Sequence, residues 1–149
     1  GVAVAGDKYV VAFQRAWNSE AGARIGIYDS MASTWEFVMY PLDAPESPAG
    51  GWVGLSDITP MGGMNFWVLE RDNAGGPDAR VKRIYAIDLS SYTPGEMITK
   101  TLVADVLPMT LAPNGLAYEK LEGLAHCPND DKMYLVNDND GLDDNSGET

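Results

Sequence analysis

The sequence of 149 residues has one cysteine, Cys127, one histidine, His126, and only ten basic residues. A single cysteine excludes an internal disulfide framework and a cysteine-rich zinc site. No apolar run reaches the ~18 residues of a membrane-spanning helix, and no basic and apolar leader opens the chain. Because the chain starts on Gly1 rather than Met, we expect a fragment or a processed subunit.

Positive charge is scarce, and the balance is strongly acidic. The formal net charge is −12, and residues 129–149 hold seven carboxylates against one lysine. A chain of this charge repels the phosphates of nucleic acids and anionic membranes, so we expect neither as a partner. The same charge suits cation binding, or solubility in an extracellular medium.

Short apolar runs separated by glycine and proline are typical of strands and turns rather than long helices. Two Pro/Gly-containing connectors, residues 41–51 and 108–118, divide these runs into three units. The predicted strands are residues 2–4, 9–13, 24–28 and 35–40 in the first unit, 54–58, 66–70, 81–89 and 98–106 in the second, and one on each side of a polar turn in the third, which is only half present.

The three units repeat one another. Residues 1–4 match residues 54–57 and 123–126, and residues 13–15 match residues 69–71 and 136–138. Recurring four-strand units are typical of β-propeller blades. We therefore predict an all-β chain, part of one β-propeller domain, with about two and a half four-stranded antiparallel blades. The blade-like units are residues 1–43, 52–107 and 119–140, followed by an acidic tail, 141–149. A ring needs at least ~4 blades, so missing sequence or another chain must close it.

Polar residues recur where first strands begin and second strands end, and in a propeller these ends share one channel mouth. The predicted lining is residues 14–15, 70–72, 122 and 137–140. Calcium takes roughly six to eight oxygens from carboxylates, amides and carbonyls, which this mouth offers. The predicted calcium ligands are Glu122, Asn137, Asp138 and Asp140. The alternative is a set of solvated charges in which Glu122 pairs with Arg71. Residues 138–148 resemble a linear calcium loop but fail the helix-loop-helix calcium pattern, and a flexible acidic tail fits residues 142–149 equally well.

Two arginines, Arg15 and Arg71, occupy equivalent positions in the repeat. Each is either a counter-ion for the acids or a fork for an anionic substrate. Beside calcium they suit a phosphate ester, since metal and guanidinium stabilise negative charge while water attacks. Other catalytic signals are weak: His126 and Cys127 are adjacent strand residues that point to opposite faces. We expect His126 to be packed or hydrogen-bonded, and the four tryptophans to pack between blades.

Four segments resemble the phytase-like family, also described as esterase-like activity of phytase. They are Leu-Glu-Arg-Asp at 69–72, Arg-Ile-Tyr-Ala-Ile-Asp-Leu at 83–89, Glu-Gly-Leu-Ala at 122–125 and Leu-Val-Asn-Asp-Asn at 135–139. The resemblance spans nearly the whole chain but only the later part of the family domain. It implies a β-propeller, often exported (secreted, periplasmic or extracellular), that hydrolyses phosphate or other esters and whose acids bind calcium. Carried over by position, the candidates are Glu70, Arg71, Glu122, Asp138 and Asp140.

Two hypotheses from different classes remain. In the first, the chain is a calcium-dependent hydrolase of small anionic esters, with Glu70 and Arg71 catalytic and with Arg15 and Arg71 binding the substrate. In the second, it is a non-catalytic secreted propeller, a binding or assembly module with structural calcium. A lactone-hydrolysing calcium propeller is a third reading that the sequence does not separate from the first.

Overall fold

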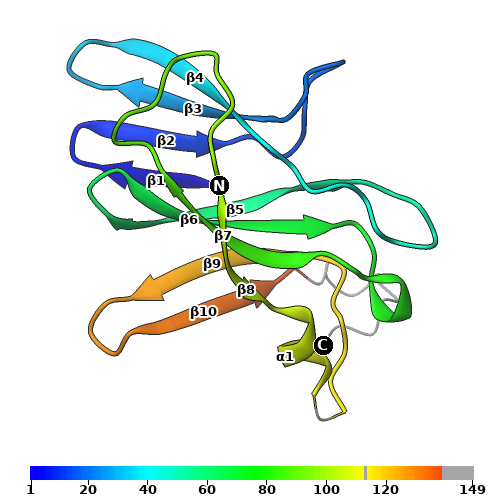
Figure 1. Cartoon of the computed structure of the whole chain (residues 1–149). Coiled ribbons are helices and arrows are strands. Elements are labelled where there is room, and N and C mark those ends of the chain that lie inside the picture. The colour runs from blue at the N-terminus through cyan, green and yellow to red at the C-terminus, as the bar shows by residue number, and fades with distance from the viewer. Residues whose placement is uncertain (113, 139–149) are drawn as a thin grey trace.

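A computed structural model of the chain describes residues 1–112 and 114–138 and contains three antiparallel sheets (Figure 1). Sheet 1 consists of β1 (Val2–Ala5), β2 (Lys8–Ala12), β3 (Ala23–Asp29) and β4 (Thr34–Tyr40). Sheet 2 consists of β5 (Val53–Gly62), β6 (Asn65–Asp72), β7 (Lys82–Asp88) and β8 (Thr101–Asp105). Sheet 3 is the pair β9 (Leu121–Cys127) and β10 (Lys132–Asn137). The prediction of an all-β chain built mostly from four-stranded antiparallel sheets is confirmed.

Within residues 1–112 and 114–138, helix is limited to two short pieces in the connections. A 3-10 turn, η1 (Gly76–Asp78), follows β6, and α1 (Leu107–Leu111) follows β8 and overlaps the start of the second predicted connector. In the described part of the chain, no helix has the length and apolar character needed to cross a membrane.

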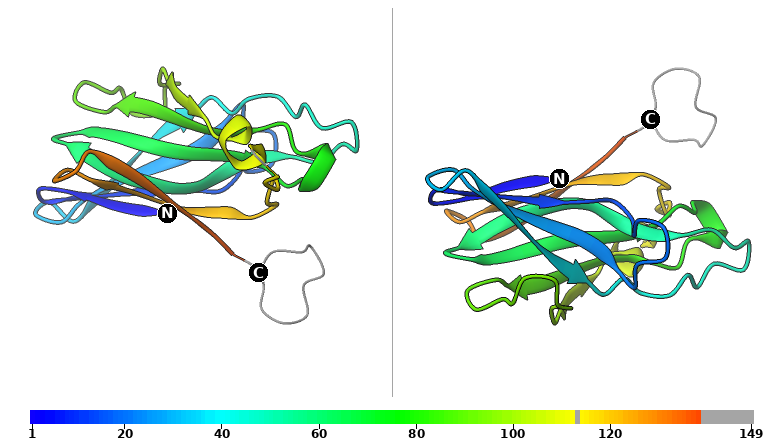
Figure 2. Two further views of the ribbon diagram at one scale, coloured as in Figure 1. Left: turned by 90° about the horizontal axis from the view of Figure 1, so that it is seen from below. Right: turned by 90° about the horizontal axis from the view of Figure 1, so that it is seen from above.

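Sheet 2 is the middle layer, with sheet 1 on one face and sheet 3 on the other (Figure 2). Successive side chains of a strand point to opposite faces, so β6 supplies both interfaces. Phe66 and Val68 are buried in the cluster shared with sheet 1, whereas Trp67 and Leu69 pack toward sheet 3. The first strands of the three sheets, β1, β5 and β9, contact one another in that order.

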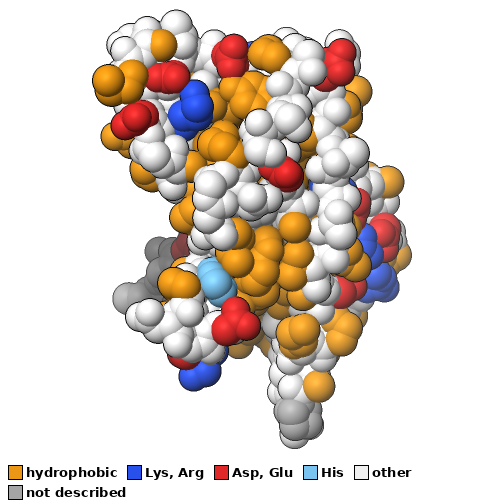
Figure 3. Space-filling view, turned by 60° about the vertical axis from the view of Figure 1, so that its left-hand side comes forward, with side chains coloured by type: hydrophobic (Ala, Val, Ile, Leu, Met, Phe, Trp, Pro, Cys, Tyr) orange, Lys and Arg blue, Asp and Glu red, His pale blue; other side chains and the backbone are white. Residues whose placement is uncertain are grey.

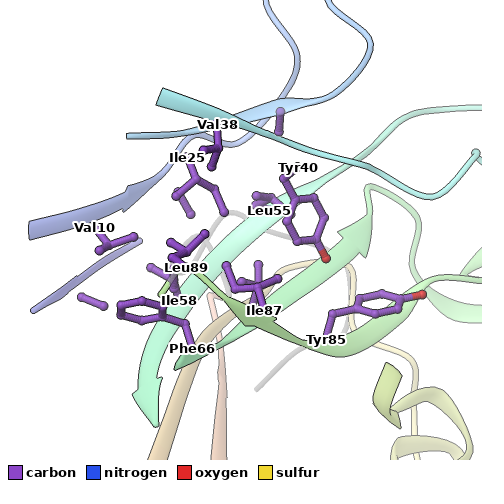
Figure 4. Packing of buried hydrophobic residues seen from close by; sticks show 14 of the residues in the cluster. Val10, Ile25, Val38, Tyr40, Leu55, Ile58, Phe66, Tyr85, Ile87 and Leu89 are labelled. Atoms are coloured by element: carbon purple, nitrogen blue, oxygen red, sulfur yellow. The ribbon is translucent and has the colours of Figure 1, made fainter. Parts of the chain in front are cut away.

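The largest apolar cluster fills the space between sheets 1 and 2 (Figure 4). Val10, Ile25, Phe66 and other β-branched or aromatic side chains pack there away from water. Tyr40 belongs to this cluster too, but its hydroxyl oxygen points to the edge of the cluster. A polar network therefore meets the apolar core at that edge.

One prediction of strand bounds is wrong, because β8 begins at Thr101 rather than at residue 98. Residues 95–98 bond instead to the free edge of β4 in the neighbouring sheet: Gly95 N donates to Phe37 O (2.7 Å), Met39 N to Glu96 O (2.9 Å) and Ile98 N to Met39 O (2.9 Å). An outer strand leaves unpaired backbone groups that must find partners. This segment supplies them and ties sheet 2 to sheet 1.

A buried ion pair ties sheet 2 to the segment before β9. The side chains of Asp72 and Lys82 are each 2% exposed, and Lys82 Nζ lies 2.9 Å from Asp72 Oδ1. Lys82 Nζ also donates to the backbone oxygen of Glu119 (2.8 Å). Burial alone raises the pKa of Asp72, but hydrogen bonds from Lys82 and from two backbone N–H groups outweigh it and leave this pKa below its usual value.

We expect Asp72→Asn to lower the free energy of unfolding by about 3–5 kcal/mol, because it leaves Lys82 buried without its counter-ion. Since the pKa of Asp72 is depressed in the folded state, its contribution is present above the unfolded pKa of about 3.9 and is lost as pH falls below it. Denaturant unfolding at several pH values should show a shallower acid loss in the variant than in the wild type. The control is Asp78→Asn, at an exposed position of η1. Equal losses in both variants would contradict the assignment.

Candidate functional site

The C-terminal end of β6 carries three charged residues in a row, Glu70, Arg71 and Asp72, all buried. Alternation along the strand sends Glu70 toward sheet 1 and Arg71 toward sheet 3. The sequence prediction placed all three around one mouth. The structure instead divides them, and only Arg71 joins the group of side chains that reaches solvent beside β9.

Arg71 is 3% exposed, and three groups hold its guanidinium. Its Nε donates to Ser56 Oγ (3.0 Å), Nη1 donates to the backbone oxygen of Asp72 (3.2 Å), and Nη2 forms an ion pair with Glu122 Oε1. Ser56 lies at a bulge in β5, between the pairs that Leu55 and Asp57 make with β6. Such a bulge redirects a side chain, here toward the arginine.

Glu122 occupies a second bulge, at the start of β9. The register passes from Leu121 paired with Asn137 to Gly123 paired with Val136. The predicted meeting of the start of β9 with the end of β10 is therefore confirmed. The Glu122 side chain is 33% exposed, so it forms the solvent-facing half of the pair with Arg71.

Both arginines of the repeat lie close to the ring of Trp52. The Arg15 guanidinium carbon is 4.6 Å from the centre of the indole ring and that of Arg71 is 5.4 Å away. Asn73 fixes the Trp52 backbone, since Trp52 N donates to Asn73 Oδ1 (2.8 Å) and Asn73 N donates to Trp52 O (3.2 Å). Arg15 is exposed, and within the described residues it forms no ion pair.

A close backbone approach brings the Arg15 segment to β5. Leu55 N donates to Gln14 O at 2.7 Å. A Cβ atom on Gly54 would lie 2.5 Å from the same carbonyl oxygen, closer than side chains tolerate. Glycine at 54 is therefore a packing requirement of the site.

Glu70 lies on the other side of β6 and is fully buried. Tyr40 and Lys100 each donate to Oε2 at 2.7 Å, and the backbone N–H of Asp43 donates to Oε1. Burial raises the pKa of Glu70, and the bonds from Lys100, Asp43 and Tyr40 offset only part of that rise. In this geometry the carboxylate fastens sheet 2 to the end of sheet 1, and its predicted catalytic role stays a prediction.

The predicted calcium ligands are only partly within the described structure. Asn137 and Asp138 lie beside the start of β9, where Asp138 N donates to Lys120 O (2.9 Å). Asp140 and the tail 141–149 lie outside the described residues. Across residues 1–112 and 114–138, no three His, Cys, Asp or Glu side chains gather into a possible metal site. Calcium at these four residues therefore stays a prediction, and Glu122 forms the ion pair with Arg71 that the sequence left open as the alternative.

The histidine lies at the other end of β9, beside hydrophobic side chains (Figure 3). The rings of His126 and Trp67 meet edge to face with centroids 5.2 Å apart, and His126 Nε2 is 3.1 Å from Asp131 Oδ1. The prediction of a packed, hydrogen-bonded histidine is confirmed.

Sequence reasoning missed the role of Trp52 and the partners of Glu70. Trp52 was expected to pack between blades, and the residues around it give no sign that two arginines meet on one indole ring. Lys100 lies thirty positions from Glu70, and no sequence motif or strand spacing predicts that their side chains meet.

Comparison with known proteins agrees with the residues that suggested a family. The model of the Phytase-like family, described as esterase-like activity of phytase, matches residues 1–141. This chain belongs to the phytase-like family. No curated protein and no solved structure matches it. The match covers the candidate site from Arg15 to Glu122.

We expect Arg71→Lys to lower the free energy of unfolding by about 1–3 kcal/mol, because an ammonium lacks the planar fork that reaches Ser56, Asp72 and Glu122 together. Urea denaturation gives this quantity directly. Arg24→Lys is a matched control: Arg24 also stacks on a tryptophan, Trp17, and pairs with Glu20, but at the surface. The control should change little, and an equal effect at both positions would contradict a special role for the Arg71 fork.

Proposed function

We propose that this phytase-like chain supplies part of an active site that hydrolyses small anionic esters, and that the site is the mouth formed by Arg15, Trp52, Arg71 and Glu122. The observation that carries the proposal is the ion pair of buried Arg71 with half-exposed Glu122, beside a second arginine on the same indole ring. Family membership supports esterase-like hydrolysis in general terms.

Each residue has a definite task in this proposal. Arg15 attracts the anionic group, while Arg71, buried and paired with Glu122, orients that carboxylate toward the attacking water. Glu122 Oε1 is engaged by Arg71, and Oε2 makes no hydrogen bond to the described residues. Oε2 then accepts a proton from the attacking water and passes that proton to the oxygen of the departing alcohol as the ester bond breaks. Glu70, which the sequence offered as catalytic, maintains the position of Arg71 by fixing β6.

We assign calcium, the expected cofactor, a structural rather than a chemical part. Its support is the acidic sequence after β10, where Asn137 and Asp138 are followed by Asp140 and the tail 141–149. Arg71 already occupies one oxygen of Glu122, and a neighbouring guanidinium repels a second cation. Calcium bound by the residues that follow β10 would hold that end of sheet 3 in place.

We also propose that the three sheets are blades of a β-propeller. Their first strands lie side by side, which is the arrangement around a propeller channel. The outer face of sheet 1 carries a cross-strand row of Val4, Tyr9, Tyr28 and Trp35, of which Val4, Tyr9 and Trp35 are 45–53% exposed. Another sheet, from further sequence or another chain, would cover this row.

A non-catalytic role is the second candidate. The engagement of Glu70 and Arg71 in bonds within the protein favours it, because both residues then serve the fold. In that case the chain is an exported binding or assembly module, as its acidity suits an extracellular medium. Secretion to the periplasm or outside the cell is part of either proposal.

Substitution of the two glutamates separates the candidates. We expect Glu122→Gln to lower kcat by about 10²–10⁴-fold, the usual contribution of a general base, and Glu70→Gln to lower stability while kcat of the folded protein is retained. The kcat of each variant is measured with the full chain on 4-nitrophenyl phosphate, a 4-nitrophenyl carboxylic ester and a lactone, and stability is measured by thermal unfolding. Glu46→Gln, an exposed carboxylate, is the control. If only Glu70→Gln loses kcat, Glu70 is the catalytic residue, as the sequence predicted. If the wild-type chain hydrolyses none of the three substrates, the hydrolase proposal is wrong and the non-catalytic binding module is supported.

Calcium removal tests the structural ion. We expect a chelator to lower the melting temperature of the full chain and to leave kcat, measured well below that temperature, nearly unchanged. Asp138→Asn and Asp140→Asn should each reduce the stabilisation that added calcium gives. A loss of turnover at a temperature where the protein is still folded would assign calcium to the chemistry instead.

A further inference from the structure

We infer that a hollow beside Trp52 is a subsite for a ligand with one negative charge on a flat apolar body, such as an aryl carboxylate, rather than for a polyphosphate. The hollow lies between the end of sheet 1 and the start of sheet 2, next to the proposed mouth. Its identity as the substrate's subsite rests on the proposed function. Its ligand chemistry follows from its walls.

The hollow has the size and the apolar lining of a small-molecule site. Its volume is about 340 Å³, within the roughly 300–1,000 Å³ that ligand pockets span. Trp52, Leu42 and Pro45 give it apolar walls, and Arg15 lies at its rim. A planar ring of six carbons with one charged substituent fits such a volume.

Among the described residues, the charges around the hollow leave one cation, Arg15, without an ion-pair partner. Asp43 also lines the hollow, but Lys100 bonds to its Oδ1 (2.8 Å), while Arg83 (2.7 Å) and Tyr85 (2.6 Å) bond to its Oδ2. Glu122 neutralises Arg71, the other arginine near the indole ring. Within the described residues, Arg15 is therefore the one guanidinium here that can bind an external anion.

A polyphosphate needs several cations close together, because each added negative charge must be neutralised or else repelled. This site offers one, in a chain whose net charge is −12. A ligand with one negative charge matches the single available cation, Arg15. Binding such a ligand leaves no buried charge without a partner.

Arg15 is also held ready for such a group. Its guanidinium lies 4.6 Å from the centre of the indole, so stacking leaves the N–H groups at its edge available. Those donors match the two oxygens of a carboxylate or of a phosphodiester. Asn73 fixes the backbone of Trp52 through two hydrogen bonds, so the residue on which Arg15 stacks is already ordered before the ligand binds.

The test is a set of binding titrations on the full chain by calorimetry. The probes are benzoate, neutral benzyl alcohol and, in calcium-free buffer, inositol hexakisphosphate. We expect benzoate to bind most tightly. Arg15→Gln should weaken benzoate by about ten- to a hundredfold and leave benzyl alcohol nearly unchanged, since a charged hydrogen-bonded pair is worth that factor. Trp52→Leu should weaken both aromatic probes.

The matched control is Arg24→Gln, which removes another stacked arginine, one that Glu20 already neutralises. It should leave all three affinities unchanged. Equal benzoate affinity in wild type and Arg15→Gln would overturn the inference, as would tighter binding of the hexakisphosphate than of benzoate.

Ester hydrolysis, measured separately, distinguishes this inference from the proposed function. Benzoate binding that depends on Arg15 in a protein without turnover supports the subsite and refutes the hydrolase. Turnover that Arg15→Gln leaves unchanged for both a neutral ester and its carboxylate-bearing analogue refutes the subsite and leaves the hydrolase intact.

Discussion

The structure depends on the need to pair three consecutive buried charges at the end of β6. A buried ionised group is costly unless partners and hydrogen bonds surround it. Glu70 finds its partners on sheet 1 and in the segment before β8, Arg71 on β5 and β9, and Asp72 on β7. The three sheets are thus connected through one short strand segment, in addition to their apolar contacts.

The same constraint shapes the candidate site. Arg71 is rigid because it is buried and bound on all sides, and its one solvent-facing partner is Glu122. Arg15, its counterpart in the repeat, lies past the end of β2 and stays exposed. A shared indole ring therefore brings together one neutralised guanidinium and one available guanidinium. Two residues that look equivalent in the sequence take different parts.

Much of the architecture could be predicted because strand patterns are local. Apolar runs between glycines and prolines defined the strands, and in the structure the chain turns between β1 and β2 at Gly6, which has φ +59°. Local patterns failed where a distant edge competed for backbone hydrogen bonds, as at residues 95–98, which bond to β4. The bulges at Ser56 and near Glu122 also left no mark in the sequence.

The sequence by itself determined the fold class, the family and the repeated placement of charge at strand ends, because these follow from residue order and period. Only the tertiary structure decided how those charges are used. Alternation along β6 separates Glu70 from Arg71, and the packing of sheet 3 brings Glu122 into an ion pair with Arg71. The physical reason is that an ion pair depends on distances of a few ångströms between segments far apart in the chain, which no local pattern encodes.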